Sequence, residues 1–318
     1  WVSPEIAVVA ETEFWPNLFA ACHSRGIPLY LVNVRLSQES LRGYLRVPKT
    51  SRRMMGHATL ICAQTASDAQ RLRSLGISRP KIEVTGNLKF DAPLPEALLE
   101  EASELRKRWG AERPVWIAAS THSGEERRIL RAFRELRSAY RDLLLVLVPR
   151  HPERFGTVAR LCRMSGATIA LRSRHSGYLP AYVEILVGDT MGELQQLYAA
   201  SDLAFVGGSL VGVGGHNLLE PCAVGVPVVF GPHMFHFEEI SNLAIENGAG
   251  SQVADVDALI SRVAFYLEQP VLRAAAGEAA RRLVAANRGA VERTLSLMSE
   301  SSLLAELKPI EPYETTVL

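Results

Sequence analysis

Short runs of branched apolar residues recur along most of the chain, and they constrain its fold more than any other feature. Their hydrophobicity is continuous rather than alternating, which is typical of strands buried on both faces of a parallel sheet. Segments with helical periodicity separate the runs, and this βαβα order predicts a doubly wound α/β protein. The runs expected to form strands are Ile6–Ala10, Leu29–Val32, Thr59–Ala63, Ile82–Thr85, Val115–Ala119, Leu143–Val148, Ile185–Val187, Leu203–Val206 and Val228–Phe230.

Several helix ends are also predicted from the sequence. Pro16 suits a first helical turn, and Ser67–Gln70 is typical of a capping box. A charged helix is expected over Glu96–Arg108, and another from near Gly192 to Ser201–Asp202.

The turn-rich, proline-bearing stretch Gly86–Pro95 predicts a boundary between two domains, which is the default expectation for 318 residues. Residues 1–88 are expected to form a Rossmann-like domain that is incomplete at its N-terminus, because its strand–helix pattern starts partway. Residues 89–290 supply enough strand–helix units for a complete Rossmann-like domain. A C-terminal helix and tail are expected at residues 291–318.

Composition narrows the functional classes. Lys and Arg number 35 against 34 Asp and Glu, so the charge balance gives no support to wholesale nucleic-acid binding. The cysteines are scattered without a CxxC pair, which argues against a disulfide framework or a zinc site and favours a reducing compartment. No apolar run approaches the length of a membrane span.

The densest chemical signal is the segment Gly207–Pro221, where a strand is expected to end in a glycine-rich loop and a helix to begin near His216–Asn217. Glycines let backbone N–H groups approach an anion, and a helix N-terminus adds positive potential, so phosphate or carboxylate binding is predicted. Glu220, one turn into that helix, is placed to accept hydrogen bonds from vicinal hydroxyls such as those of a ribose. The alternative is an ordinary tight turn with Glu220 in solvent. The candidate binding residues here are Gly208, Ser209, Gly214, Gly215, His216, Asn217 and Glu220.

Three more strand–helix junctions are expected at the same carboxyl edge of the sheet, where ligands of such folds bind. Each has an alternative explanation: Ser123 would cap a helix, Arg150 would form a surface salt bridge, and Asp189 would be another cap. The candidate ligand contacts in these junctions are Ser120, Thr121, His122, Arg150, His151, Met191, Gly192 and Glu193.

Two carboxylates, Glu11 and Glu13, follow the first expected strand beside Trp15. Such groups suit acid–base chemistry or binding of a sugar hydroxyl, and one of them would otherwise cap a helix. Lys89, in the boundary stretch, would attract an anionic substrate. The basic run Arg42–Arg53 is interpreted as a solvated helix face, with anionic lipid phosphates as the less favoured partner.

Several motifs, in this order, resemble those of the 3-deoxy-D-manno-octulosonic acid (Kdo) transferases of lipopolysaccharide synthesis. They are Glu11–Asn17, Asn33–Ser37, Thr85–Asp91, Pro149–Phe155, Gly188–Leu194, Gly207–Pro221 and Phe230–Phe237. The resemblance spans residues 5 to about 290, and it departs at Leu218, where family members often have proline.

The resemblance implies a GT-B glycosyltransferase, with two Rossmann-like domains whose parallel sheets face each other across a cleft. It implies inverting, metal-independent transfer of Kdo from CMP-Kdo, without a cofactor. The acceptor would be the lipid A precursor lipid IV(A), at the cytoplasmic face of the bacterial inner membrane.

The resemblance also implies roles for particular residues. In the second domain, Asn217 and Glu220 would contact ribose or phosphate, and the Gly214–His216 backbone would contact the phosphate. Arg150, His151 and the Met191–Glu193 loop would hold the rest of the nucleotide. In the first domain, Glu11 or Glu13 would lie near Kdo or the acceptor, and Lys89 would help to hold an anionic group.

Family members carry an N-terminal membrane anchor and a glutamate base in a Gly/Ser-rich loop, and neither occurs in this sequence. The general base is therefore expected upstream of Trp1, and the chain is expected to bind CMP but transfer little Kdo. Two alternatives stay open: a GT-B transferase or epimerase that uses a UDP-sugar, and a non-catalytic nucleotide-binding module.

Overall fold

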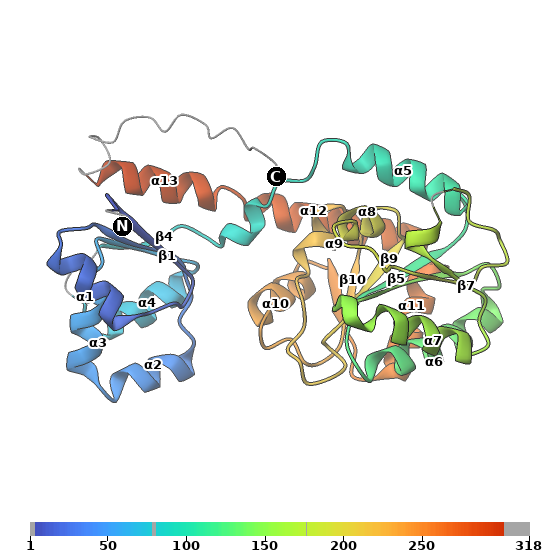
Figure 1. The fold of residues 1–318 in the computed structure, drawn as a ribbon, viewed down its shortest axis with the longest axis horizontal. Helices are drawn as coiled ribbons and strands as arrows, with labels where there is room; N and C mark the ends of the chain where they lie inside the picture. The colour runs from blue at the N-terminus through green and yellow to red at the C-terminus, as the bar shows by residue number, and fades with distance from the viewer. Residues whose placement is uncertain (1–3, 78–80, 176, 302–318) are drawn as a thin grey trace. The chain divides into compact units, whose positions relative to one another are not determined.

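Each predicted apolar run forms a strand within two residues of its expected bounds, and the strands form two separate parallel sheets (Figure 1). The computed structural model describes residues 4–77, 81–175 and 177–301. Contacts divide the chain into a first unit, residues 1–92 with 287–318, and a second unit, residues 93–286. The predicted α/β class with parallel sheets is confirmed. The predicted tail after residue 301 lies outside the described residues, and the functional boundaries at residues 88 and 290 stay predictions.

The first unit is built on a four-stranded sheet of order β1-β2-β3-β4. Its strands are β1 (Ala7–Ala10), β2 (Leu29–Val34), β3 (Leu60–Ala63) and β4 (Lys81–Val84), and its helices are α1 (Pro16–Ser24), α2 (Gln38–Leu45), α3 (Pro48–Met55), α4 (Ala66–Ser74), the 3-10 turn η1 (Leu88–Asp91) and α13 (Ala290–Glu300). Figure 1 shows α13 on one face of this sheet and α1 to α4 on the other. Met298 of α13 packs on Tyr30 and Leu60, so a segment from the far end of the chain covers the sheet.

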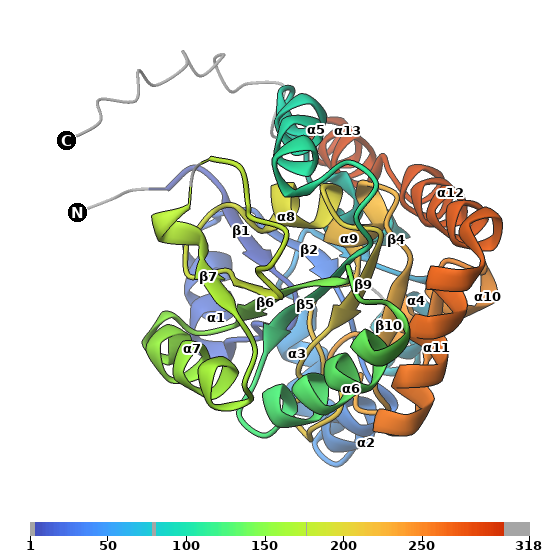
Figure 2. The ribbon, with the colours of Figure 1, turned by 90° about the vertical axis from the view of Figure 1, so that its right-hand side faces the viewer.

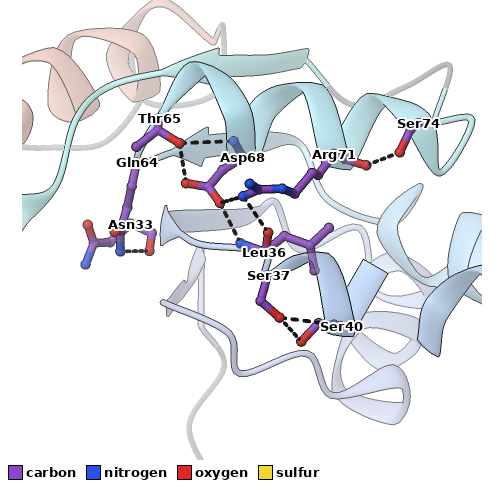
Figure 3. Close-up of polar contacts among 9 residues, drawn as sticks. All are labelled: Asn33, Leu36, Ser37, Ser40, Gln64, Thr65, Asp68, Arg71 and Ser74. Carbon is purple, nitrogen blue, oxygen red and sulfur yellow. Dashed lines mark hydrogen bonds and ion pairs between the residues drawn. The ribbon is translucent and has the colours of Figure 1, made fainter. Parts of the chain in front are cut away.

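A buried carboxylate ties the end of β2 to the start of α4 (Figure 3). Asp68 is 2% exposed, and it accepts hydrogen bonds from the Leu36 backbone N–H at 2.9 Å and the Thr65 hydroxyl at 2.6 Å. Arg71 lies 3.3 Å from the same carboxylate, so the buried charge is paired. The capping box predicted at Ser67 is therefore wrong by two residues, because Thr65 is the N-cap and accepts from the Asp68 N–H.

The second unit is built on a seven-stranded sheet of order β11-β10-β9-β5-β6-β8-β7. The strands are β5 (Val115–Thr121), β6 (Leu144–Pro149), β7 (Ile169–Leu171), β8 (Ile185–Val187), β9 (Leu203–Val206), β10 (Val228–Phe230) and β11 (Gly250–Gln252). The helices and 3-10 turns are α5 (Leu98–Trp109), α6 (Glu125–Ala139), η2 (Pro152–Arg154), α7 (Phe155–Met164), η3 (Arg172–Arg174), α8 (Leu194–Ala199), α9 (Leu219–Ala223), α10 (Glu238–Glu246), α11 (Val256–Glu268) and α12 (Pro270–Ala286). Helices α6, α7 and α11 bury one face of the sheet, and α5 and α8 bury the other (Figure 2).

The strand order of this sheet reverses direction at β5. The chain runs from β5 to β6 on one side and later returns through β9 on the other side of β5. In open parallel sheets the loops at such a switch point diverge and leave a crevice outside the carboxyl ends of the strands. The fold therefore directs attention to the loops after β5, β6, β8 and β9.

Two helices predicted in the second unit have other bounds, and the alternative role of Ser123 as a helix cap is not observed. The helix expected near His216–Asn217 begins at Leu219, so Glu220 lies in its first turn. The helix expected from Gly192 to Asp202 is only Leu194–Ala199, because Asp202 instead accepts the Val115 N–H at 2.7 Å and pairs with Arg106 at 2.9 Å. Ser123 caps nothing, since the N-cap of α6 is Gly124 in a left-handed conformation.

Candidate functional site

Glu125, the first residue of α6, joins the loop after β5 to the glycine-rich loop after β9. Its fully buried carboxylate accepts backbone N–H groups from Gly208 at 2.7 Å, Ser209 at 3.0 Å and Leu210 at 2.9 Å, and from His122 at 3.0 Å. Burial raises the pKa of Glu125, while the four backbone donors oppose that shift. The first part of the glycine-rich loop thus binds an anion from within the protein.

This arrangement changes the interpretation of two predicted binding residues. The amides of Gly208 and Ser209 are occupied by Glu125, so they do not form the open phosphate cradle that the glycine pattern predicted. The Ser209 side chain is fully buried, donates to the Val206 carbonyl and accepts from the Gly231 N–H. Glu125 was missed because an acidic residue in the first turn of a helix is ordinary on electrostatic grounds.

The loops at the switch point approach too closely for a side chain at Gly207. A Cβ there would lie 2.5 Å from the Ser120 carbonyl oxygen. Ser120 itself has a positive φ of 56°, which is uncommon for a residue with a side chain. Glycine is therefore required at position 207, beside the Ser120 backbone, where the sequence predicted ligand contacts.

A second buried carboxylate, Glu126, fixes the loop after β6. It accepts a hydrogen bond from Thr121 at 3.1 Å and forms an ion pair with Arg154. The Arg150 N–H also donates to the Thr121 carbonyl at 3.1 Å. Thr121 is fully buried and thus contributes to the contact between these two loops. The Arg150 side chain is exposed.

Two imidazole rings from different loops meet at the centre of the site. The Nε2 atoms of His122 and His216 are 2.7 Å apart, and the rings are within 6° of parallel. His151 meets His122 edge-on, with ring centroids 5.3 Å apart. Burial, followed by repulsion from His122 and Arg150, lowers the pKa of His216 to about 4, and burial lowers the pKa of His122 as well. Both rings are therefore neutral at pH 7.

A cleft of about 330 Å³ lies beside His216, within the second unit. Its lining residues are Ser120, Val148, Pro149, Arg150, Phe155, Thr190, Met191, Gly192, Leu194, Leu197, Tyr198, His216, Asn217, Glu220 and Phe237. Seven of the predicted site residues belong to this lining, from all four predicted loops: Ser120, Arg150, Met191, Gly192, His216, Asn217 and Glu220.

Glu220 and Asn217 line this cleft and are hydrogen-bonded to each other. The Asn217 amide donates to the Glu220 carboxylate at 3.2 Å, and its oxygen accepts the Leu219 N–H at 3.0 Å. Burial raises the pKa of Glu220, and Asn217 and Arg150 partly oppose that shift. Since α9 has only five residues, the positive charge beside an anion in this cleft comes mainly from Arg150 rather than from a helix dipole.

The other predicted residues of the second unit lie near the cleft, but they contact other residues of the protein. Gly214 and Gly215 pack against the segment 233–236, and the His236 N–H donates to the Gly214 carbonyl at 3.1 Å. Glu193 forms an ion pair with Arg172 at 2.6 Å and accepts a hydrogen bond from Thr190. His151 lies at the edge of the site, 4.0 Å from Glu153.

In the first unit, two of the three predicted residues are in contact. Lys89 Nζ lies 2.9 Å from Glu11 Oε1, and both side chains are about half exposed. Glu13 instead accepts a hydrogen bond from the Trp15 indole at 2.9 Å. Asn33, which was not singled out, accepts the Leu88 N–H at 3.0 Å and so holds the turn that carries Lys89.

Neither a metal centre nor a membrane span is found in the described part of the chain. Within residues 4–77, 81–175 and 177–301, no three His, Cys, Asp or Glu side chains are grouped so as to hold an ion. No helix among the same residues combines the length and the hydrophobicity that crossing a bilayer requires.

Two family models match the chain. Residues 1–92 match the 3-deoxy-D-manno-octulosonic-acid transferase (kdotransferase) model, and residues 175–283 match the model of glycosyl transferases group 1. The 3-deoxy-D-manno-octulosonic acid transferase of Haemophilus influenzae is 41% identical over 94% of this chain and 70% of its own length. The enzyme of the same name from Bordetella pertussis is 38% identical over 94% of this chain and 69% of its own length.

Solved structures agree with these relatives. The C-terminal CMP-Kdo binding domain of WaaA from Acinetobacter baumannii is 34% identical, with a TM-score of 0.57 over 60% of this chain and 99% of that domain. UDP-GlcNAc 2-epimerase from Neisseria meningitidis, solved with UDP-GlcNAc, has a TM-score of 0.60 over 94% of this chain and 76% of its own. Its identity is only 16%, so this second likeness concerns the fold alone.

Proposed function

The chain belongs to the Kdo transferases, glycosyltransferases of the GT-B fold, and from this we propose that it transfers Kdo from CMP-Kdo to the lipid A precursor lipid IV(A). We propose further that transfer inverts the anomeric carbon, needs no metal ion or cofactor, and takes place at the cytoplasmic face of the bacterial inner membrane. The observation that carries the proposal is the cleft lined by Arg150, His216, Asn217 and Glu220. It occupies the edge of the sheet where ligands of this fold bind, and the similarity to a solved CMP-Kdo binding domain supports CMP as its occupant.

The lining groups suit the parts of a cytidine nucleotide. The Glu220 carboxylate, already held by Asn217, has oxygens that accept hydrogen bonds from the vicinal hydroxyls of a ribose. Arg150 supplies a planar cation for the phosphate. The exposed Met191 side chain and the Gly192 backbone border the remaining space, where the base would lie.

Transfer makes the phosphate group more negative. The acceptor hydroxyl oxygen would bond to the anomeric carbon of Kdo and give its proton to the general base. The bond between Kdo and the phosphate oxygen would break at the same time, and its electron pair would stay on the phosphate as CMP departs. Positive groups placed at that oxygen in advance stabilise the developing charge. Arg150 meets this requirement in the second unit, and this supports a metal-independent reaction.

The first unit would contact Kdo or the acceptor. Glu11 and Lys89 form an ion pair at the carboxyl edge of the four-stranded sheet, and both remain about half exposed. A lipid A precursor carries phosphates, and Lys89 would exchange its partner carboxylate for such an anion. Glu13 and Trp15, which are hydrogen-bonded to each other, would contribute a sugar-binding surface beside it.

The donor part of the proposal is tested by calorimetric titration with CMP and with UDP. We expect CMP to bind more tightly, and equal or tighter binding of UDP would favour a UDP-sugar enzyme instead. The acceptor part is tested by incubating the protein with CMP-Kdo and lipid IV(A), with and without EDTA, and weighing the lipid by mass spectrometry. We expect the lipid to gain Kdo slowly, because the general base is expected upstream of Trp1, and we expect EDTA to leave that rate unchanged. Transfer to another hydroxylated acceptor but not to lipid IV(A), or a loss of transfer with EDTA, would refute the corresponding part.

A further inference from the structure

The contact between His122 and His216 has a consequence for how many protons the site holds. Two Nε2 atoms 2.7 Å apart form one N–H···N hydrogen bond, so one ring donates and the other accepts. In the neutral pair, one ring is therefore protonated at Nε2 and its partner at Nδ1. A second proton at the contact would place two N–H groups against each other, whereas a proton added at the free Nδ1 keeps the hydrogen bond intact.

The position of the pair is enforced by its surroundings. The His122 N–H is held by Glu125, and a Cβ at Gly208 would lie 3.0 Å from the His216 ring, so the imidazole occupies the space that a side chain there would need. His216 lines the cleft beside Arg150 and Asn217. The two rings are thus fixed to each other, and His216 is the ring that lines the cleft.

We propose that the His122–His216 pair acts as one proton acceptor, which takes up a proton when the phosphate of the nucleotide enters the cleft. The inference rests on the proposed function, and it deepens that function by naming a second source of positive charge for the departing phosphate. In CMP-Kdo the phosphate carries one negative charge, and in released CMP it carries two above its second pKa of about 6. The proton on the pair offsets the added charge and stays on the pair.

The charges around the pair explain why it is neutral before the ligand binds. The titratable and charged groups facing it are Arg150, Arg154, Glu126, His151 and His236, together with Glu220 across the cleft. Burial, followed by repulsion from the partner ring, from Arg150 and from the two other histidines, lowers the pKa of His216 to about 4. A phosphate beside the rings reverses the sign of the local potential, and an opposite charge within 4–6 Å raises the pKa of an imidazole by about 1–3 units or more when it is hydrogen-bonded.

The test is the number of protons exchanged when CMP binds, measured by calorimetry at pH 6.5 in buffers with different ionisation enthalpies. The wild type is compared with the double variant His122→Gln/His216→Gln, in which the amides can hydrogen-bond but do not titrate. The ionisation of CMP contributes to both proteins, so the difference reports the pair. We expect the wild type to take up about half to one proton more than the double variant. Cytidine, which lacks the phosphate, should show no such difference, and neither should His175→Asn against wild type with CMP.

Two results overturn the inference in different ways. If CMP binds the wild type with the same proton count as the double variant, the pair takes up no proton and only this inference fails. If CMP does not bind the wild type at all, the donor part of the proposed function fails, and the inference fails with it. If the double variant does not fold, the single variant His216→Gln gives the same comparison, and a proton count equal to that of the wild type refutes the pair.

Discussion

At the scale of single residues, the cleft combines the half-buried carboxylate of Glu220 with the exposed cation of Arg150. Glu220 is half-buried, and burial raises its pKa, while Asn217 and Arg150 oppose that shift. Each has a distinct expected partner on a nucleotide, hydroxyls for Glu220 and phosphate for Arg150. The two contributions can therefore be separated by measuring the CMP affinity of each variant, because only the contribution of Arg150 should depend strongly on the salt concentration.

Replacing Glu220 with Gln should weaken CMP binding about 5- to 150-fold, because about 1–3 kcal/mol is lost with a charge-assisted hydrogen bond. The measurement is calorimetric titration of the folded variant. Glu246→Gln, at the exposed end of α10, is the matched control and should bind as the wild type does. Unchanged affinity in Glu220→Gln would remove Glu220 from the site.

Replacing Arg150 with Ala should weaken CMP binding more at low salt than at high salt, since screening already reduces the attraction of an exposed cation at high ionic strength. Affinity is measured at about 0.02 and 0.5 M salt. A loss of folding stability with no change in CMP affinity would instead indicate that Arg150 is a surface ion-pairing residue.

The lowered pKa of His216 predicts how stability depends on pH. An imidazole whose pKa falls from 6.5 unfolded to about 4 folded binds more protons in the unfolded state, so stability is complete above 6.5 and is lost as the pH falls towards 4. His216→Gln should reduce this loss by roughly 1–2 kcal/mol, allowing for the partial exposure of the ring. Chemical unfolding at pH 7.5 and 4.5 measures it, with His175→Gln as control. An equal loss in wild type and variant would contradict the expectation.

At the scale of elements, the sequence predicts the positions of the strands far better than the contacts between the loops that connect them. The apolar runs predict strands because burial on both faces leaves an unbroken hydrophobic pattern. Strand β11, Gly250–Gln252, carries no such run and was missed, as was the three-residue strand β7. The glycine-rich loop was found from composition, but the sequence does not show that Glu125 fills its first amides, because that contact joins residues 83–85 positions apart.

Helix α13 shows the same limit. Its N-cap is Gly289, which has no side chain to cap the helix, and Asp91 of η1 supplies the cap instead. The Asp91 carboxylate accepts the N–H groups of Gly289 and Val291, both at 2.6 Å, from almost 200 residues away in the chain. A long-range cap leaves no local signature, so the sequence predicts the helix but not its attachment to the first sheet.

Asp91→Ala should loosen α13 by about 1–2 kcal/mol, the usual cost of losing a charged cap. Backbone amides of α13 should then exchange with deuterium about 5- to 30-fold faster than in wild type. Glu292→Ala, an exposed carboxylate in the same turn, serves as control and should change exchange much less. Equal exchange in Asp91→Ala and wild type would show that the Asp91 cap does not hold the helix.

At the scale of the whole molecule, the two units divide the work that a sugar transfer requires. The second unit holds a cleft at the switch point of a seven-stranded parallel sheet, lined by residues from four loops. The first unit carries an exposed ion pair, Glu11 with Lys89, at the carboxyl edge of its own sheet. Under the proposed function, the donor nucleotide would bind to the second unit, and Kdo or its acceptor would contact the first.

The most direct test of this account is the footprint of CMP in hydrogen exchange of the full chain. CMP should slow exchange in the four loops after β5, β6, β8 and β9, at about residues 120–125, 149–154, 188–193 and 207–220, and leave β1 to β4 unchanged. UDP at the same concentration should slow these loops less. Protection by CMP that falls in the first unit, or protection of the same loops by UDP but not by CMP, would contradict the assignment of the cleft to the donor nucleotide.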